Sequence, residues 1–413
     1  MRLFQQGYAL ILLMLVIMAL GTTLLFRNLS VDARTSPDSQ VRQASDLKEA
    51  RAVLLLYAFN GGVSNDPTSG RPGTLPCPDM NEPTESGFGE MNVGSCTGEG
   101  DVSLGRIPWD TLDMSVPSEP VWLAIDDKFL NHRDTEPVNP DFQQAPADPL
   151  WGRLTLDNRD RLAAVLIAPG SPIRLPSHDQ VTGRESSDAF DYLERVNALT
   201  DTESRYEFTN CGGEPGIGDG DNQCNDRAVG VRASDLMRLA RKRVLLEVER
   251  LLREAHRPTA APQIPYAAAF GSSPLQSCEP GLTHGLLALV PFEASEDEEA
   301  PPGCRDDDLL FSQEPIDSNG SSYPEFCELV PVWLRPANPH FEEDFGCDQP
   351  GDGDDEHGPA GNDWLRFVSY ELQPDADCSD PSQACVVDLG FIDQEPEDDE
   401  LVVRRVVLEP MEE

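Results

Sequence analysis

Apolar residues run without a charge from Tyr8 to Phe26, after a short polar segment that ends in Gly7. As a helix this stretch is about 28 Å long, close to the thickness of the hydrocarbon core of a bilayer. A signal peptide usually has a shorter apolar core. The pattern therefore predicts a membrane-spanning helix over residues 8–26, preceded by a separate leader at residues 1–7.

A helical period follows this apolar stretch. Residues 27–37 are polar, and Pro37 is expected to interrupt a continuing helix. Beyond Pro37, apolar residues recur at the spacing of one helix face. We therefore expect residues 27–60 to continue the first helix outside the bilayer, with a break near Pro37. The positions of this face are Val41, Ala44, Leu47, Ala50, Leu54 and then Tyr57 or Ala58.

Shorter apolar runs in the rest of the chain predict a mixed α+β fold. The runs "LAAVLIAP" (162–169) and "RAVGVRAS" (227–234) have the length and composition of buried strands. A helix is expected to follow Ser234 as its N-cap and to end before Pro258. Its apolar stripe is typical of a helix that packs on a core. The stripe consists of Leu236, Leu239, Ala240, Val244, Leu245, Val248, Leu251 and Leu252.

The second half of the chain resembles the first in the order of its segments. "IPYAAAFG" follows the second helix as "LPCPD" follows the first, and "HGLLALVPF" stands where "GRIPW" stood. "DWLRFVSYEL" corresponds to "VWLAIDDKF", and "ELVVRRVVLEP" to "RDRLAAVLIAP". This order predicts a first α+β domain at residues 61–258 and an acidic second one at residues 259–413. The alternative is a chance likeness between two helix-plus-sheet segments.

The net charge of the chain limits the classes of molecule that it is expected to bind. Asp and Glu number 74 against 31 Lys and Arg, which gives a net charge of −43. Such a surface repels phosphate backbones, so nucleic acid is not expected as a partner.

The ten cysteines all lie beyond the apolar stretch, and none forms a CxxC pair. An even number without tight pairs predicts disulfides formed in an oxidising compartment. Their spacing predicts three local bonds, and leaves the order of Cys278, Cys304, Cys327 and Cys347 open. The expected pairs are Cys77 with Cys96, Cys211 with Cys224, and Cys378 with Cys385.

Calcium is the one cofactor that the sequence brings into consideration. "DGDDEHGPAGND" places Asp352, Asp354, Glu356 and Asp363 at spacings that resemble the oxygen ligands of an EF-hand loop. His357 stands where the sharp turn of such a loop needs a glycine. A second run, "DGDNQCND" from Asp219, has no carboxylate at its twelfth position. The alternative is that both are hydrated acidic loops.

No pattern in the chain carries the chemistry of an enzyme. The sequence contains no HExxH, no GxSxG and no phosphate-binding glycine loop. We therefore expect a protein that assembles or binds and does not catalyse.

The N-terminal segment resembles a prepilin of the type IV pilus and type II secretion superfamily. The resemblance rests on a short leader with one positive charge, its final Gly7, the aromatic Tyr8 and the apolar helix. It extends to roughly residues 50–256. There "LPCPD", a second cysteine, "GRIPW" and the late "NDR" strand resemble a group of large prepilin-like proteins of Gram-negative bacteria.

This resemblance implies the processing and the partners of the chain. A prepilin peptidase would cut between Gly7 and Tyr8 and methylate the new N-terminus. The family's glutamate at the fifth mature position is replaced here by Leu12. Minor pilins and pseudopilins without this glutamate stand at the filament tip, so the resemblance implies a tip or priming subunit. It would contact other minor subunits through its helix, with the helix in the inner membrane and the head in the periplasm or outside the cell.

Two alternatives from other classes remain open. The residues Ala19, Leu20 and Gly21 have the sizes that signal peptidase accepts, so an ordinary signal would release the head after Gly21. An uncleaved anchor would hold it at the membrane. In both cases the head would be a periplasmic binding or adhesion module, or a hydrolase.

Overall fold

The computed structural model describes part of the 413-residue chain. The described residues are 37–61, 71–92, 102–117, 119–131, 138, 152–170, 186–194, 197–198, 206–211, 224–255, 267, 282, 284–287, 334, 364–373, 384–391 and 403–408. The leader and the membrane helix expected at residues 1–7 and 8–26 lie outside them. Across the described residues, no helix has the length and apolarity needed to cross a membrane.

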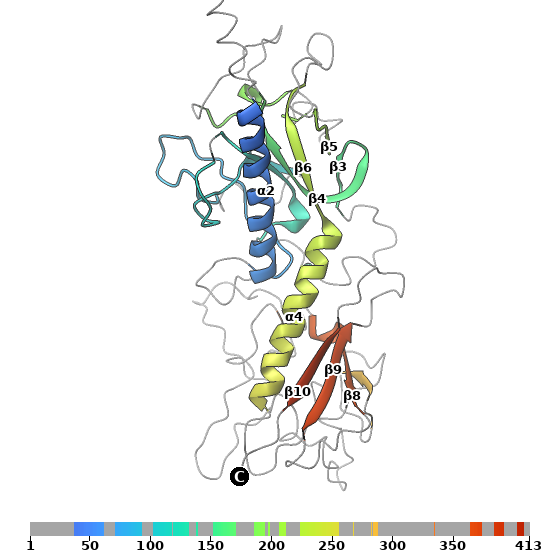
Figure 1. Ribbon diagram of the computed structural model, residues 1–413. Coiled ribbons are helices and arrows are strands. Elements are labelled where there is room, and N and C mark those ends of the chain that lie inside the picture. Colours follow the sequence, from blue (N-terminus) through green and yellow to red (C-terminus); the bar gives the residue numbers. More distant parts are fainter. Residues whose placement is uncertain are drawn as a thin grey trace, which may run out of the picture.

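The described residues form an α+β fold with two long helices and two sheets (Figure 1). Helix α2 spans Pro37–Asn60 and helix α4 spans Ala233–Ala255. The first sheet contains β1 (Val102–Arg106), β2 (Trp122–Asp126), β3 (Leu154–Leu156), β4 (Arg159–Ala168), β5 (Glu207–Phe208) and β6 (Arg227–Arg232). The second contains β7 (His284–Leu286), β8 (Val368–Leu372), β9 (Cys385–Phe391) and β10 (Arg404–Leu408). Short 3-10 helices lie at Asp127–Phe129, Ala189–Asp191 and Trp364–Phe367.

The same order of elements occurs twice along the chain. Helix α2 is followed by β1, β2, β4 and β6, each antiparallel to the next. Helix α4 is followed by β7, β8, β9 and β10, again each antiparallel to the next. The first sheet has two additions, because β3 forms a hairpin with β4 and β5 lies parallel to β3. The expected correspondence between "ELVVRRVVLEP" and "RDRLAAVLIAP" is wrong. The first of these contains β10, which occupies in the second sheet the place that β6, and not β4, has in the first.

Helix α2 packs against β4, β6 and α4. Leu47, Ala50 and Leu54 are buried as the periodicity predicts, but Val41 is 68% exposed. The expected apolar face is therefore wrong for its first turns. These turns lie at the end of the sheet and bind through polar groups: Gln43 Nε2 donates to the carbonyl of Pro169 at 2.9 Å.

The start and the end of α2 follow from local chemistry. Proline fits the first turn of a helix because the missing N–H has no partner there, and α2 begins at Pro37. Residues 27–36 lie outside the described residues, so the break expected near Pro37 stays a prediction. At the other end Gly61 has φ +75°, a conformation that glycine adopts without strain. The N–H of Gly73 then donates to the carbonyl of Ala58 at 2.7 Å, which brings the returning chain back onto the helix.

Helix α4 follows β6 without a connecting residue, so Ser234 lies inside its first turn and the N-cap prediction is wrong. The expected stripe is buried except for Leu239, which is partly exposed, and burial of α4 extends beyond that stripe. Arg241 and Glu247 are buried too, and the helix contacts α2, β4, β6, β9 and β10. Figure 1 shows α4 running from the first sheet to the second. One continuous hydrophobic core therefore includes both helices and the inner faces of both sheets.

The opposite faces of the first sheet differ in what covers them. The helices cover one face, and a second cluster lies on the other. Tyr192 and Leu193 of the segment 186–198 pack there on Trp122 of β2, with ring centroids of Trp122 and Tyr192 5.6 Å apart. The rest of this outer cluster is Ala124, Leu154, Leu156, Leu162, Val165, Ile167, Ala198, Phe208 and Ala228.

Replacing Leu54 by alanine tests the packing of α2. The side chain is fully buried, so Leu54→Ala is expected to lower the free energy of unfolding by about 2–5 kcal/mol. Val41→Ala removes an exposed side chain of the same helix and is expected to change it by less than about 0.5 kcal/mol. Urea unfolding of the detergent-solubilised chain measures both. Equal effects of the two variants would contradict the packing described here.

Candidate functional site

Several residues predicted as sites lie outside the described residues. These are Gly7, Tyr8 and Leu12 of the expected processing and assembly segment, and Asp352, Asp354, Glu356 and Asp363 of the expected calcium loop. The processing site and the calcium loop therefore stay predictions.

The structure brings the two motif segments "LPCPD" and "GRIPW" together. Asp79 and Arg106 form an antiparallel bridge, with Asp79 N donating to Arg106 O at 2.8 Å and Arg106 N donating to Asp79 O at 2.9 Å. A Cβ on Gly105 would lie 2.8 Å from the Asp79 carbonyl oxygen, so only glycine permits this approach. The segment after α2 thus covers the edge of β1.

A buried ion pair lies at this junction. Arg106 Nε is 3.7 Å from Asp79 Oδ2, and both side chains are almost inaccessible to solvent. The Asp79 carboxylate also accepts hydrogen bonds from the N–H of Asn81 and of Gly89, each at 2.9 Å. The Arg106 guanidinium lies over the ring of Phe88, with Cζ 4.5 Å from the ring centroid, and binds the Asn81 carbonyl. These contacts fix the loop 79–92 against β1.

Trp109 closes the same loop from the other side. Its indole contacts the backbone of Gly89, where an added Cβ would lie 2.3 Å from the ring. Phe88 meets Trp109 edge to face, with centroids 6.1 Å apart. Most of the contacts described here hold the loop, and Arg106 also donates to the carbonyl of Ser186 at 3.4 Å, so we interpret the two motifs as a structural joint.

A second charged joint connects β2 to β3. Arg153 donates to Asp126 from its backbone N at 2.9 Å and from its side-chain Nε at 3.0 Å. The neighbouring Asp127 accepts from Ser103 Oγ at 2.6 Å. Burial raises the pKa of the Asp127 carboxyl, and the Ser103 hydrogen bond partly opposes this rise. Both carboxylates hold strand ends in place.

The cysteines agree with an oxidised protein in the described part. A disulfide joins Cys211 to Cys224, as expected from their spacing, with Cα atoms 5.7 Å apart. Cys77 and Cys385 are also disulfide-bonded. Their expected partners, Cys96 and Cys378, lie outside the described residues, so these two pairings stay predictions.

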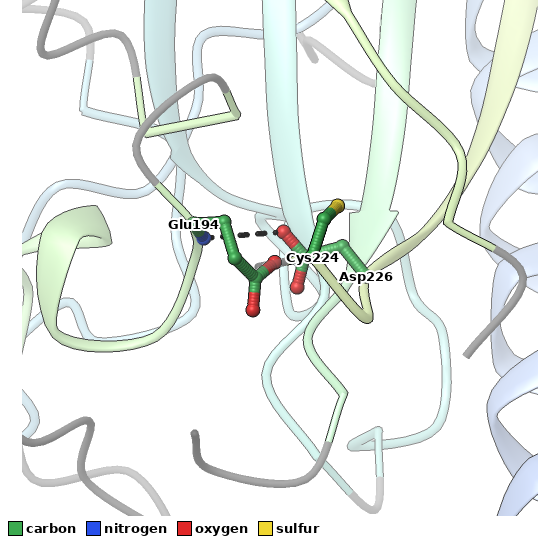
Figure 2. A group of neighbouring side chains, drawn as sticks. All are labelled: Glu194, Cys224 and Asp226. Carbon is green, nitrogen blue, oxygen red and sulfur yellow. Dashed lines mark hydrogen bonds between the residues drawn. The ribbon is translucent and has the colours of Figure 1, made fainter. Parts of the chain in front are cut away.

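Two buried carboxyl groups meet beside this disulfide (Figure 2). Asp226 is 0% exposed and Glu194 2%, and a side-chain hydrogen bond joins them. Burial, followed by the neighbouring Glu194, raises the pKa of Asp226 well above its usual value. Asp226 also accepts from Asn197 Nδ2 at 2.9 Å. Asp226 ends the run "DGDNQCND", so the interpretation of this run as a hydrated loop is wrong at that residue.

A metal would have few ligands here among the described residues. Three possible ligand atoms lie within 4.8 Å of one another, one each from the side chains of Glu194, Cys224 and Asp226. The sulfur of Cys224 is bonded to Cys211 and is no thiolate, so two carboxyl groups remain.

The described residues contain one histidine, on the second sheet. His284 Nδ1 lies 3.7 Å from Glu371 on the outer face of that sheet, and both side chains are about half exposed. The ion pair is therefore a surface contact between neighbouring strands.

The structure adds contacts that the sequence did not predict. Arg106 carries a signal in hindsight, because a charge inside the apolar run "SLGRIPW" calls for a buried partner. For Glu194 no such signal exists in its segment, "DAFDYLERVNALTD".

Comparison with known proteins gives no relative. No protein-family model, no curated protein and no solved structure matches the chain.

Replacing Asp79 by asparagine tests the buried joint. Asp79→Asn removes the carboxylate charge that faces the buried Arg106, so the free energy of unfolding is expected to fall by about 3–5 kcal/mol. The matched control is Asp110→Asn, which removes an exposed carboxylate near the same loop and is expected to cost less than about 0.5 kcal/mol. Chemical denaturation of both variants measures the difference. A loss no larger than that of the control would show that the pair does not stabilise the fold.

Proposed function

We propose that the chain is a non-enzymatic minor subunit of a type IV filament or of a type II secretion pseudopilus, standing at the tip or priming assembly. Prepilin peptidase would process it, and the helix at residues 8–26 would hold it in the inner membrane. Its head would lie in the periplasm, or outside the cell in an assembled filament.

The observation that carries the proposal is the packing of α2. Helix α2, the first described helix after the apolar segment, lies on a sheet in which β1, β2, β4 and β6 are each antiparallel to the next. In a pilin-class subunit, a membrane helix that continues onto a sheet transmits the position of the head to the filament core. Here Pro37 begins the helix that would make this connection.

The repetition of helix and sheet supports a large head built from two pilin-like units. The second unit would comprise α4 with β7 to β10, and it has no apolar stretch of its own because α4 follows β6 directly. In the described residues, Ala267 N donates to Leu282 O at 2.8 Å shortly before β7. This contact resembles the bridge between Asp79 and Arg106 beside β1.

Two further features support an exported assembly protein. The Cys211–Cys224 disulfide agrees with folding in an oxidising compartment. Leu12 in place of the family's glutamate removes the carboxylate that would pair with a neighbouring subunit's amine, and an unpaired buried charge is costly. This loss favours a place with no subunit above it.

Mass spectrometry of the mature N-terminus tests the proposal. In cells with prepilin peptidase we expect a chain that begins at N-methylated Tyr8, and in cells without it the uncut chain. Gly7→Val is expected to block the cut because the peptidase acts after glycine.

The matched control is Gly21→Val, at the position where an ordinary signal would end. It is expected to leave the Tyr8 start unchanged. A mature chain that begins at Thr22 and is lost in Gly21→Val would overturn the proposal and indicate a secreted binding module or hydrolase. An uncut chain in cells with the peptidase would also overturn it.

A further inference from the structure

The described residues 186–194 and 197–198 form a cover over the outer face of the first sheet. Tyr192 and Leu193 insert into an apolar cluster whose sheet side includes Trp122, Ile167 and Phe208. In the second sheet, the described residues of the corresponding face are mostly polar, such as Asp388 and Arg405. The cover therefore hides an apolar surface that has no counterpart in the described second half.

Asp226 makes two of the polar contacts that attach this cover. Its Oδ2 accepts from the backbone N–H of Glu194 at 3.4 Å (Figure 2) and from Asn197 Nδ2 at 2.9 Å. Asn197 also exchanges two hydrogen bonds with the backbone of Thr209, and Ser186 and Ser187 bond to Arg106 and Glu82. On the sheet side its Oδ1 accepts from Gly170 N at 3.4 Å. Its own carbonyl accepts from Cys211 N at 2.9 Å, so the disulfide loop shares this anchor.

The carboxyl group of Glu194 lies against the same anchor. Burial of Asp226 beside a second carboxyl group raises the pKa of Asp226 and so favours its protonated form, because two adjacent buried negative charges repel strongly. The described groups around Asp226 are Glu194, Asn197, Gly170 and Cys211, and none of them is cationic. The neighbouring Arg227 instead donates to Gln40 of α2 at 3.3 Å.

We propose that the Glu194–Asp226 pair is a proton-dependent latch, which keeps this cover on the sheet while the pair is protonated and releases it when the proton is lost. Release would expose the apolar face around Trp122. The device is independent of how the N-terminus is processed.

The sign of the pH dependence follows from the direction of the shift. The pKa of Asp226 is raised in the closed state, so this state binds more protons than the open one. The stability that the pair contributes is complete below the ordinary pKa of a carboxyl group. It is lost as the pH rises through the raised pKa. For one proton, the equilibrium constant for opening of the cover increases by up to about tenfold per pH unit.

Hydrogen exchange of the full oxidised chain, followed by mass spectrometry from pH 4 to pH 9 in the presence of EDTA, tests the latch. After correction for intrinsic exchange, peptides from 186–198 are expected to open increasingly with pH. Peptides from α4 are expected to stay protected and so report the overall fold. An equal rise in the α4 peptides, or no rise in 186–198, would overturn the proposal.

Three variants complete the test. Glu194→Gln is expected to remove most of the pH dependence in 186–198, because a neutral amide donates to the ionised Asp226. Asp226→Asn is the second variant, and it is also expected to remove most of the pH dependence. It replaces Glu194→Gln if the α4 peptides of that variant are no longer protected, because the fold is then lost. Glu207→Gln is the matched control, since it neutralises an exposed carboxylate on β5, and it is expected to keep the full pH dependence.

Two results would contradict the latch. One is an unchanged pH profile in both Glu194→Gln and Asp226→Asn. The other is loss of cover protection at neutral pH in EDTA that added calcium restores, because the pair would then be held by a cation and not by a proton.

Discussion

The burial of α4 against both sheets and α2 is the constraint on which the rest of this structure depends. Its apolar residues pack against the first sheet at one end and against the second sheet at the other. Neither sheet therefore has a complete hydrophobic core without α4. Polar contacts fix its two ends: Asp235 accepts from Arg51 Nη2 of α2 at 3.1 Å, and Glu249 pairs with Arg404 of β10. Two arginine pairs hold the pKa of Glu249 below its usual value although burial opposes this. A helix shared in this way makes the two helix-and-sheet units mechanically continuous.

The two sheets present different surfaces once their inner faces are covered. On the second sheet, a row of side chains crosses all four strands, from Arg405 to Asp388, Glu371 and His284. Arg405 contacts Asp388 at 2.6 Å and holds the pKa of that carboxyl below its usual value. On the first sheet the corresponding face is apolar and is covered by the chain's own segment 186–198. Exposed charge pairs contribute little stability, so the polar row bears on solubility and partner choice more than on the fold.

The buried charges of the first unit stabilise loops that have few apolar residues. Asp79 with Arg106, and Asp126 with Arg153, each tie a loop to a strand end through several hydrogen bonds. Such joints are costly to break once formed, which gives a defined shape to a chain rich in glycine and proline. A fixed head on a helix is compatible with the proposed role of an assembly subunit, which would present a surface.

The sequence by itself determined the elements. The buried faces of α2 and α4, the strands β4 and β6, and the Cys211–Cys224 bond follow from local periodicity, composition and spacing. These features depend on neighbours along the chain, which a single sequence displays.

Only the tertiary structure decided which distant residues meet. The pairs of Asp79 with Arg106 and of Glu194 with Asp226 join residues far apart in sequence, and a charge on one strand does not say which loop will return to it. The exposure of Val41 and the burial of Arg241 were likewise set by where the sheets end and by how many elements surround α4. The physical reason is that burial depends on the whole assembly of elements, whereas periodicity reports only the preference of one element for a face.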